Sequence, residues 1–166
     1  MSVVMMASSM MKKMIAYFGA DVKRINHALK VYALAKSIGE LEGLTGEKLE
    51  ILDAASILHD IGIKESERKY SSTAGKYQQL EGPPIAREFL QEFNLSQSFV
   101  ERVCYLIGNH HTYTKIDDLD FQILVEADFL VNIFEGDLGQ EQVEIIKEKY
   151  FKTKTGRSYL ESMYLS

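Results

Sequence analysis

Hydrophobic positions recur every three to four residues along most of the chain, which is the spacing of one face of an α-helix. Runs of alternating β-branched and polar residues, which would indicate strands, are scarce. The pattern predicts an all-α fold built as a single compact multi-helix domain. Glycines, prolines and capping residues divide it into helices over about 21–39, 47–62, 83–93, 96–110, 119–134 and 140–152, with a short last helix after Thr155 or Gly156.

Two segments do not follow this pattern. Residues 64–82 are polar and rich in serine and glycine, which predicts a connecting loop with room for one short helix. The adjacent Pro83 and Pro84 would then occupy the first turn of the next helix. Residues 1–12 are apolar but lack the basic flank of a signal peptide. We expect them to form a frayed lead-in to a domain over residues 13–166.

The bulk composition narrows the classes of function. A chain of 166 residues has the length of one domain, and its net charge of −5 gives no support for binding a nucleic-acid polymer. An anionic small molecule remains compatible, because local basic residues or a metal can set the charge within a cleft. The single cysteine, Cys104, excludes an intrachain disulfide framework and is typical of a reducing cytosol. We therefore expect a cytoplasmic protein that does not associate with membranes.

Four polar residues lie on otherwise apolar faces of the predicted helices. His59 and Asp60 end the apolar segment Ala54–Leu58, while His27 and Asp128 lie on apolar stripes elsewhere. Burying such groups costs several kcal/mol unless hydrogen bonds or a metal compensate. Singly, His27 would be an ordinary core histidine, and Asp128 a buried hydrogen-bond or salt-bridge partner. Together, two histidines and two aspartates form the donor set of a divalent metal site.

The segments that carry these residues resemble the HD-domain superfamily of metal-dependent phosphohydrolases. The likeness rests on Arg24-Ile25-Asn26-His27, Leu58-His59-Asp60-Ile61-Gly62 and Glu126-Ala127-Asp128-Phe129-Leu130, in the family's order. It extends over about residues 15–162, with further similar stretches at 80–87, 107–111 and 155–157. The resemblance implies that His27, His59, Asp60 and Asp128 bind one divalent ion of manganese, iron, cobalt, nickel, zinc or magnesium.

The resemblance also implies a reaction, hydrolysis of a phosphate mono- or diester by metal-activated water. A nucleotide or related small phosphorylated metabolite is the expected substrate. Asp60 would border the attacking water. A second reading is a metal-containing ligand-binding or regulatory module that catalyses nothing, and a third is a helical adaptor without metal. The oligomeric state stays open, and a homodimer is one option.

Further candidates surround these four residues. His110 would serve as a general acid, a phosphate contact or support for the metal ligands, or it would only end a helix together with His111. Lys64 is a candidate for catalysis and for phosphate binding. The candidates for substrate binding are Lys64, Lys115, Arg24 and His111. Solvated surface side chains are the ordinary alternative for the basic residues.

Two departures from the family's patterns refine this interpretation. Family members with two metals take a further histidine from the region of Tyr77-Gln78-Gln79, where this chain has glutamines. We therefore expect one metal, with a second as the alternative. Ile63 and Lys64 follow Asp60 where alarmone hydrolases carry an acidic pair, which argues against that activity.

Overall fold

The computed structural model describes residues 3–166, and no strand occurs among them. The helices are α1 (Val3–Phe18), α2 (Val22–Leu41), α3 (Gly46–Leu58), α4 (Ile63–Tyr70), α5 (Gly75–Leu90), η1 (Gln91–Phe93), α6 (Gln97–Asn109), η2 (Tyr113–Lys115), α7 (Leu119–Glu135), α8 (Gln140–Tyr150), α9 (Lys154–Leu160) and η3 (Glu161–Leu165). The predicted all-α fold is confirmed. Within the described residues, no helix combines the length and hydrophobicity needed to cross a membrane.

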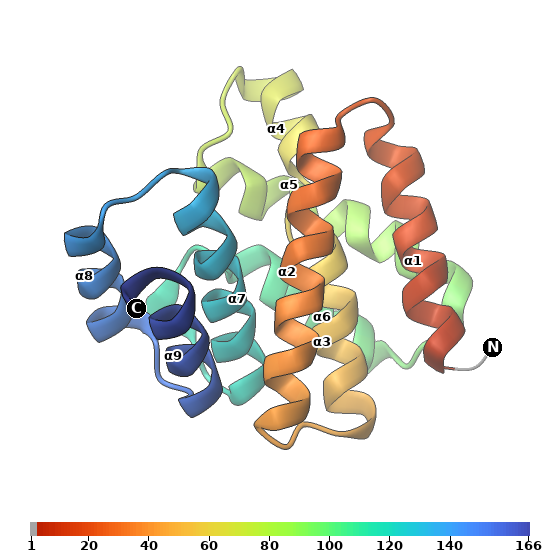
Figure 1. The fold of residues 1–166 in the computed structure, drawn as a ribbon. Helices are drawn as coiled ribbons and strands as arrows, with labels where there is room; N and C mark the ends of the chain where they lie inside the picture. Colours follow the sequence, from red (N-terminus) through yellow and green to blue (C-terminus); the bar gives the residue numbers. More distant parts are fainter. Residues whose placement is uncertain (1–2) are drawn as a thin grey trace.

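Helix α3 lies at the centre of the packing. Every residue from Ile51 to Leu58 is buried, because α1, α2, α6 and α7 all pack against this helix. In Figure 1, α2 runs through the middle of the molecule, between α1 and α7. His59 and Asp60, which directly follow α3, therefore lie between α2 and α7.

Side-chain caps fix where several helices begin. The Asp21 carboxylate accepts the backbone N–H of Arg24 at the start of α2, and Ser96 accepts that of Phe99 in α6. Asp118 accepts the N–H of Leu119 at a distance of 2.7 Å where α7 begins. These starts agree with the sequence pattern, and they place His27 and Asp128 on the helix faces that the pattern predicted.

The N-terminal segment differs from the expected frayed lead-in. Residues 3–18 form α1, and Met6, Met10 and Met14 are buried against the rest of the core. An apolar stripe at helical spacing gains more free energy by packing than by remaining exposed, which explains the difference. Over residues 3–12 the structure has a packed helix where a frayed lead-in was predicted, and residues 1–2 of that prediction lie outside the described residues.

The predicted loop over residues 64–82 contains nearly all of α4 and the first half of α5 instead. The sequence of helix α4 is polar because Ser66 is the one residue of this helix that is buried. Helix α5 begins at Gly75 and includes Pro83 and Pro84 in its interior, not in its first turn. The cause is tertiary packing, since α5 lies against both α4 and α6. A Cβ atom on Gly62 would lie 2.5 Å from the backbone N of Gly82, so the missing side chain at Gly62 allows α5 to pass this close.

Candidate functional site

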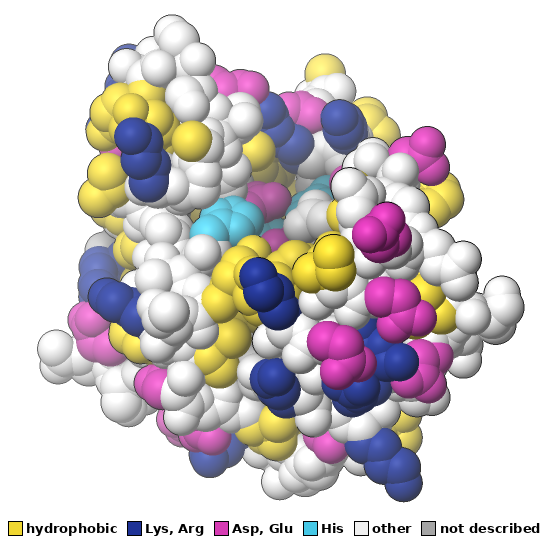
Figure 2. All heavy atoms as spheres, turned by 90° about the vertical axis from the view of Figure 1, so that its left-hand side faces the viewer, with side chains coloured by type: hydrophobic (Ala, Val, Ile, Leu, Met, Phe, Trp, Pro, Cys, Tyr) yellow, Lys and Arg dark blue, Asp and Glu magenta, His cyan; other side chains and the backbone are white. Residues whose placement is uncertain are grey.

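A cavity of about 360 Å³ opens between α2, α7 and the connection from α4 to α5. Figure 2 shows the hollow on this face, with histidine and carboxylate side chains at its floor. The residues that line the cavity are Asp21, Lys23, Arg24, His27, Asp60, Ile63, Thr73, Gln78, His111, Asp128, Asn132 and Glu135. Its size falls within the range of sites for small metabolites.

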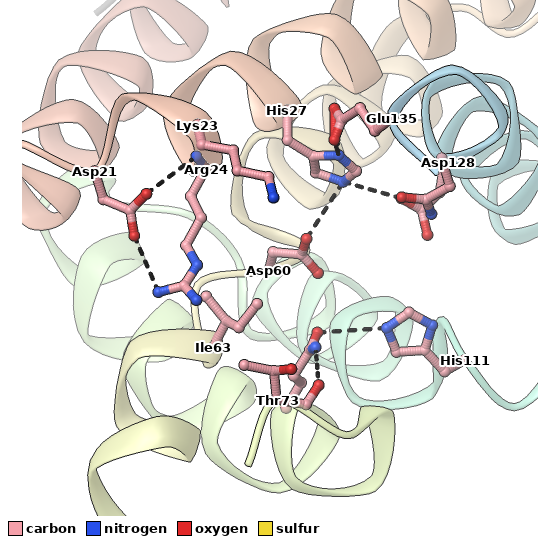
Figure 3. Close-up of a pocket in the computed structure, with 12 residues that line it drawn as sticks. Asp21, Lys23, Arg24, His27, Asp60, Ile63, Thr73, His111, Asp128 and Glu135 are labelled. Atoms are coloured by element: carbon pink, nitrogen blue, oxygen red, sulfur yellow. Dashed lines mark hydrogen bonds and ion pairs between the residues drawn. The ribbon is translucent and has the colours of Figure 1, made fainter. Parts of the chain in front are cut away.

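The four predicted metal ligands meet at the floor of this cavity. His27 Nε2 lies 3.1 Å from Asp128 Oδ1 and 3.3 Å from Asp60 Oδ2. His59 Nε2 lies 3.4 Å from each of the same two oxygens. Figure 3 shows the His27 ring pointing between Asp60 and Asp128. Two nitrogens and two carboxylates, from α2, α7 and the end of α3, therefore converge on one point.

The other ring nitrogen of each histidine determines its tautomer. His59 Nδ1 donates to the backbone oxygen of Ser56 at 2.8 Å, and His27 Nδ1 donates to the Glu135 carboxylate at 3.1 Å. In the neutral rings, both Nε2 atoms then carry lone pairs. These two atoms lie 3.1 Å apart, so their lone pairs face each other. A cation between them, either a proton or a metal ion, is required to make this arrangement favourable.

The electrostatics of the cluster favour positive charge at the same place. Burial alone would lower the pKa of His59, but Asp60 and Asp128 outweigh it, and the pKa lies well above the usual 6.5. Burial alone would raise the pKa of Asp128, but hydrogen bonds to His27 and His59 hold it well below the usual 3.8. The pKa of Asp60 is lowered in the same way, chiefly by His59 once the opposing effect of burial is overcome. Two carboxylates thus remain ionised beside buried imidazoles.

These features fit a metal ion. Donor atoms of His27, His59 and Asp60 lie within 4.8 Å of one another, as do those of Asp60, His110 and His111. The Nε2 atom of His110 is buried and makes no hydrogen bond within the described part of the chain, although Asp60 Oδ1 lies 3.3 Å away. Its Nδ1 donates to the backbone oxygen of Ile107 at 2.7 Å, so Nε2 is a third lone pair beside Asp60.

His111 occupies a different environment from His110. Burial, reinforced by the nearby His110, lowers its pKa to about 4, so the ring is neutral at pH 7. Its Nε2 lies 3.4 Å from Gln78 Oε1, and Gln78 donates in turn to the backbone oxygen of Thr73 at 2.5 Å. Gln79 accepts the backbone N–H of His111 at 3.0 Å. The two glutamines therefore hold the His110-His111 corner in place.

The structure brings Arg24 to the cavity, but its charge is already matched. Its guanidinium donates to both Glu67 oxygens, at 2.9 and 2.6 Å, and pairs with Asp21 at 3.0 Å. The exposed Lys23 also lines the cavity, and its ammonium group points into the space beside His27 in Figure 3. Sequence reasoning missed Lys23, although its position four residues before His27, one helical turn, was a usable signal.

Two of the predicted basic residues are not brought to this cavity. Lys64 Nζ donates to the backbone oxygen of Tyr17 at 3.1 Å and lies over the Tyr17 ring. Its neighbour Ile63 lines the cavity, and successive side chains on a helix point in directions about 100° apart. Lys115 is exposed and is not among the lining residues. The structure does not bring Lys64 and Lys115 to this cavity, and their role as substrate contacts stays a prediction.

Comparisons with known proteins identify the fold. The family model of the HD domain matches residues 24–149. No match is found among curated proteins. A solved structure, described as the crystal structure of a predicted HD superfamily hydrolase from an uncultured Thermotogales bacterium, matches with a TM-score of 0.65. The match covers 92% of this chain and 82% of that chain, at 23% identity. This likeness concerns the arrangement of the helices.

Proposed function

The chain belongs to the HD-domain family, and from that premise we propose that it is a metal-dependent phosphohydrolase. Its substrate would be a phosphate mono- or diester, with a nucleotide as the expected class. The observation that carries the proposal is the pair of Nε2 atoms of His27 and His59, 3.1 Å apart beside Asp60 and Asp128. Such a donor set suits one divalent ion.

A divalent ion held by His27, His59, Asp60 and Asp128 would act as a Lewis acid and make water a nucleophile near neutral pH. Asp60 belongs to the cluster and also lines the cavity, so its carboxylate could contact a water molecule that enters from the cavity and would orient it. His110 does not line the cavity, which argues against a phosphate contact, and its Nε2 lone pair 3.3 Å from Asp60 Oδ1 would instead serve as a further donor atom beside the ion. Solvent would protonate the leaving group.

The wall of the cavity supports an anionic substrate. Lys23 has an ammonium group directed into it and makes no ion pair with another described residue. Arg24 would contribute less, because Glu67 and Asp21 already surround its guanidinium. His111 is neutral at pH 7, so it would contact substrate as a hydrogen-bonding group, not as a charge. Lys23 is thus the proposed phosphate contact.

The test is a turnover assay on the full chain, loaded separately with Mn²⁺, Co²⁺, Ni²⁺, Zn²⁺ or Mg²⁺. Phosphate release would be measured from nucleoside mono-, di- and triphosphates and from aryl phosphate mono- and diesters. We expect turnover with one metal or more, and its loss in Asp128→Asn with helical content unchanged. Asp53→Asn is the matched control, because Asp53 is buried but pairs with Lys36 outside the cavity.

The alternative is the binding or regulatory module without catalysis. It would be favoured by a chain that binds metal but hydrolyses none of these substrates. Turnover that persists in the Asp128→Asn variant would contradict the proposed mechanism, because the activity would then not depend on the cluster.

A further inference from the structure

Helix α7 contacts the ring of His27 at both of its nitrogens. Asp128 Oδ1 lies 3.1 Å from Nε2, and both oxygens of Glu135 lie 3.1 Å from Nδ1. Asp128 and Glu135 are two helical turns apart, so they lie on the same face of α7. Figure 3 shows the ring between the two carboxylates.

Glu135 is itself held by a second contact. Lys30, one turn beyond His27 on α2, places its Nζ 2.9 Å from Glu135 Oε1. The Glu135 side chain is 21% exposed, so it is partly shielded from solvent where it meets His27. The carboxylate is therefore oriented by the ammonium group of Lys30 as well as by the imidazole of His27.

The three histidines of the site differ in how Nδ1 is held. His59 and His110 donate to backbone oxygens, those of Ser56 and Ile107. Among these three, His27 alone donates to a carboxylate. An ionised acceptor makes a stronger hydrogen bond than a neutral carbonyl and makes the opposite ring nitrogen a better electron donor.

We propose that Glu135 is a positioning residue for His27. It fixes the Nδ1–H tautomer and the ring orientation, so that the Nε2 lone pair points between Asp60 and Asp128. The inference rests on the proposed metal site and adds the residue that tunes the affinity of that site. Two simpler roles for Glu135 make different predictions. If Glu135 only links α7 to α2, its replacement would change the stability of the fold and not the affinity for metal. If Glu135 only attracts cations by its charge, every neutral replacement would weaken metal binding equally.

The experiment titrates Co²⁺ alone into the metal-free full chain and follows visible absorption and the thermal unfolding temperature. Glu135→Ala should weaken Co²⁺ binding about 10- to 100-fold, the usual effect of removing such a partner. Glu135→Gln keeps an oxygen that can accept from Nδ1, so its affinity should lie between wild type and Glu135→Ala. Glu101→Ala is the control, because Glu101 pairs with the surface residue Arg87. Its affinity should not change.

Nuclear magnetic resonance of the Zn²⁺-loaded protein gives a second readout. The Nδ1–H proton of His27 should be protected from exchange with water in wild type and should lose this protection in Glu135→Ala, with His59 and His110 unchanged. Wild-type affinity and wild-type protection of this proton in Glu135→Ala would overturn the inference and leave the proposed function standing. Equal weakening in Glu135→Ala and Glu135→Gln, with the proton still protected, would overturn it in favour of charge alone. A wild-type chain that binds neither metal would contradict both proposals.

Discussion

His27, His59 and His110 each use Nδ1 to donate a hydrogen bond, to Glu135 or to a backbone oxygen. Their Nε2 atoms are left as lone pairs around the two carboxylates of Asp60 and Asp128. Five acceptors that converge with no donor among them repel one another unless a cation binds. The hydrogen bonds made by the three Nδ1 atoms therefore contribute to the proposed affinity for a cation, because they leave each Nε2 atom as an acceptor.

Lys23 allows a direct test of the cavity wall. Lys23→Ala should raise KM for an anionic substrate about tenfold, because it removes a charge-assisted contact worth about 1–2 kcal/mol at a partly exposed site. The kcat value should change less, because Lys23 lies outside the metal cluster. Steady-state kinetics on the substrate found in the turnover assay would measure both quantities.

Lys64→Ala and Lys115→Ala are the matched controls for that measurement. Lys64 is turned toward Tyr17, and Lys115 does not line the cavity. Both variants should keep the wild-type KM. A large increase in KM for Lys64→Ala, with none for Lys23→Ala, would show that the assignment of the phosphate contact is reversed.

At the scale of the element, the crossing of α5 beside Gly62 supports the segment that follows His59 and Asp60. Gly62→Ala would place a methyl group 2.5 Å from Gly82 N and 2.6 Å from the Gln78 backbone oxygen. Backbone atoms cannot move as a flexible side chain can, so α5 must shift. We expect a loss of about 1–3 kcal/mol in the free energy of unfolding, measured with urea.

Gly139→Ala is the control for this effect. A methyl group there would approach only the Gln142 side chain, at 3.9 Å. Its cost should not exceed about 1 kcal/mol, the difference between glycine and alanine at a helix N-cap. Equal losses in the two variants would contradict the argument that the α5 crossing depends on Gly62.

Most helices could be predicted from the sequence because their apolar periodicity and caps are local signals. Asp21, Ser96 and Asp118 cap helices where the pattern placed their starts. Helix α5 could not be predicted this way, since Gly82, Pro83 and Pro84 normally break helices and only packing against α4 and α6 keeps it intact.

The site residues likewise divide into those with a local signal in the sequence and those whose position depends on tertiary packing. His27, His59, Asp60 and Asp128 could be found because a buried polar group on an apolar face is visible in the sequence. The sequence could not show that Lys64 and Lys115 lie outside the cavity, because the direction of a surface side chain depends on how its helix is oriented. Glu135 lies at the end of the α7 stripe, but its contact with His27 depends on how α7 crosses α2.

At the scale of the whole molecule, the cluster should make stability depend on pH. In the metal-free protein, the pKa values of His27 and His59 lie above the value of about 6.5 expected in the unfolded chain. The folded state then binds more protons than the unfolded state, so the free energy of unfolding falls as the pH rises above about 6.5. The lowered pKa values of Asp60 and Asp128 add stability above about pH 3.9, which is lost as the pH falls below it.

Urea unfolding with and without a chelator would measure this dependence. Metal-free protein should be most stable at about pH 6.5 and should lose stability by pH 8.5. Below pH 6.5 the lowered pKa of His111, about 4, acts in the opposite direction, because the unfolded chain then binds a proton at this residue more readily than the folded chain does. Saturating Zn²⁺ should reverse the loss at pH 8.5, because the ion replaces the protons between the imidazoles. Metal-free stability that stays constant between pH 6.5 and 8.5 would contradict the electrostatic account of the cluster.

Whether His27, His59, Asp60 and Asp128 hold one divalent ion can be measured by anomalous diffraction from crystals of metal-loaded protein, recorded on both sides of the metal's absorption edge. We expect one strong peak per chain, between the Nε2 atoms of His27 and His59 and the carboxylates of Asp60 and Asp128. No peak at this position in loaded crystals, or a peak only elsewhere in the chain, would show that these four residues do not form the metal site.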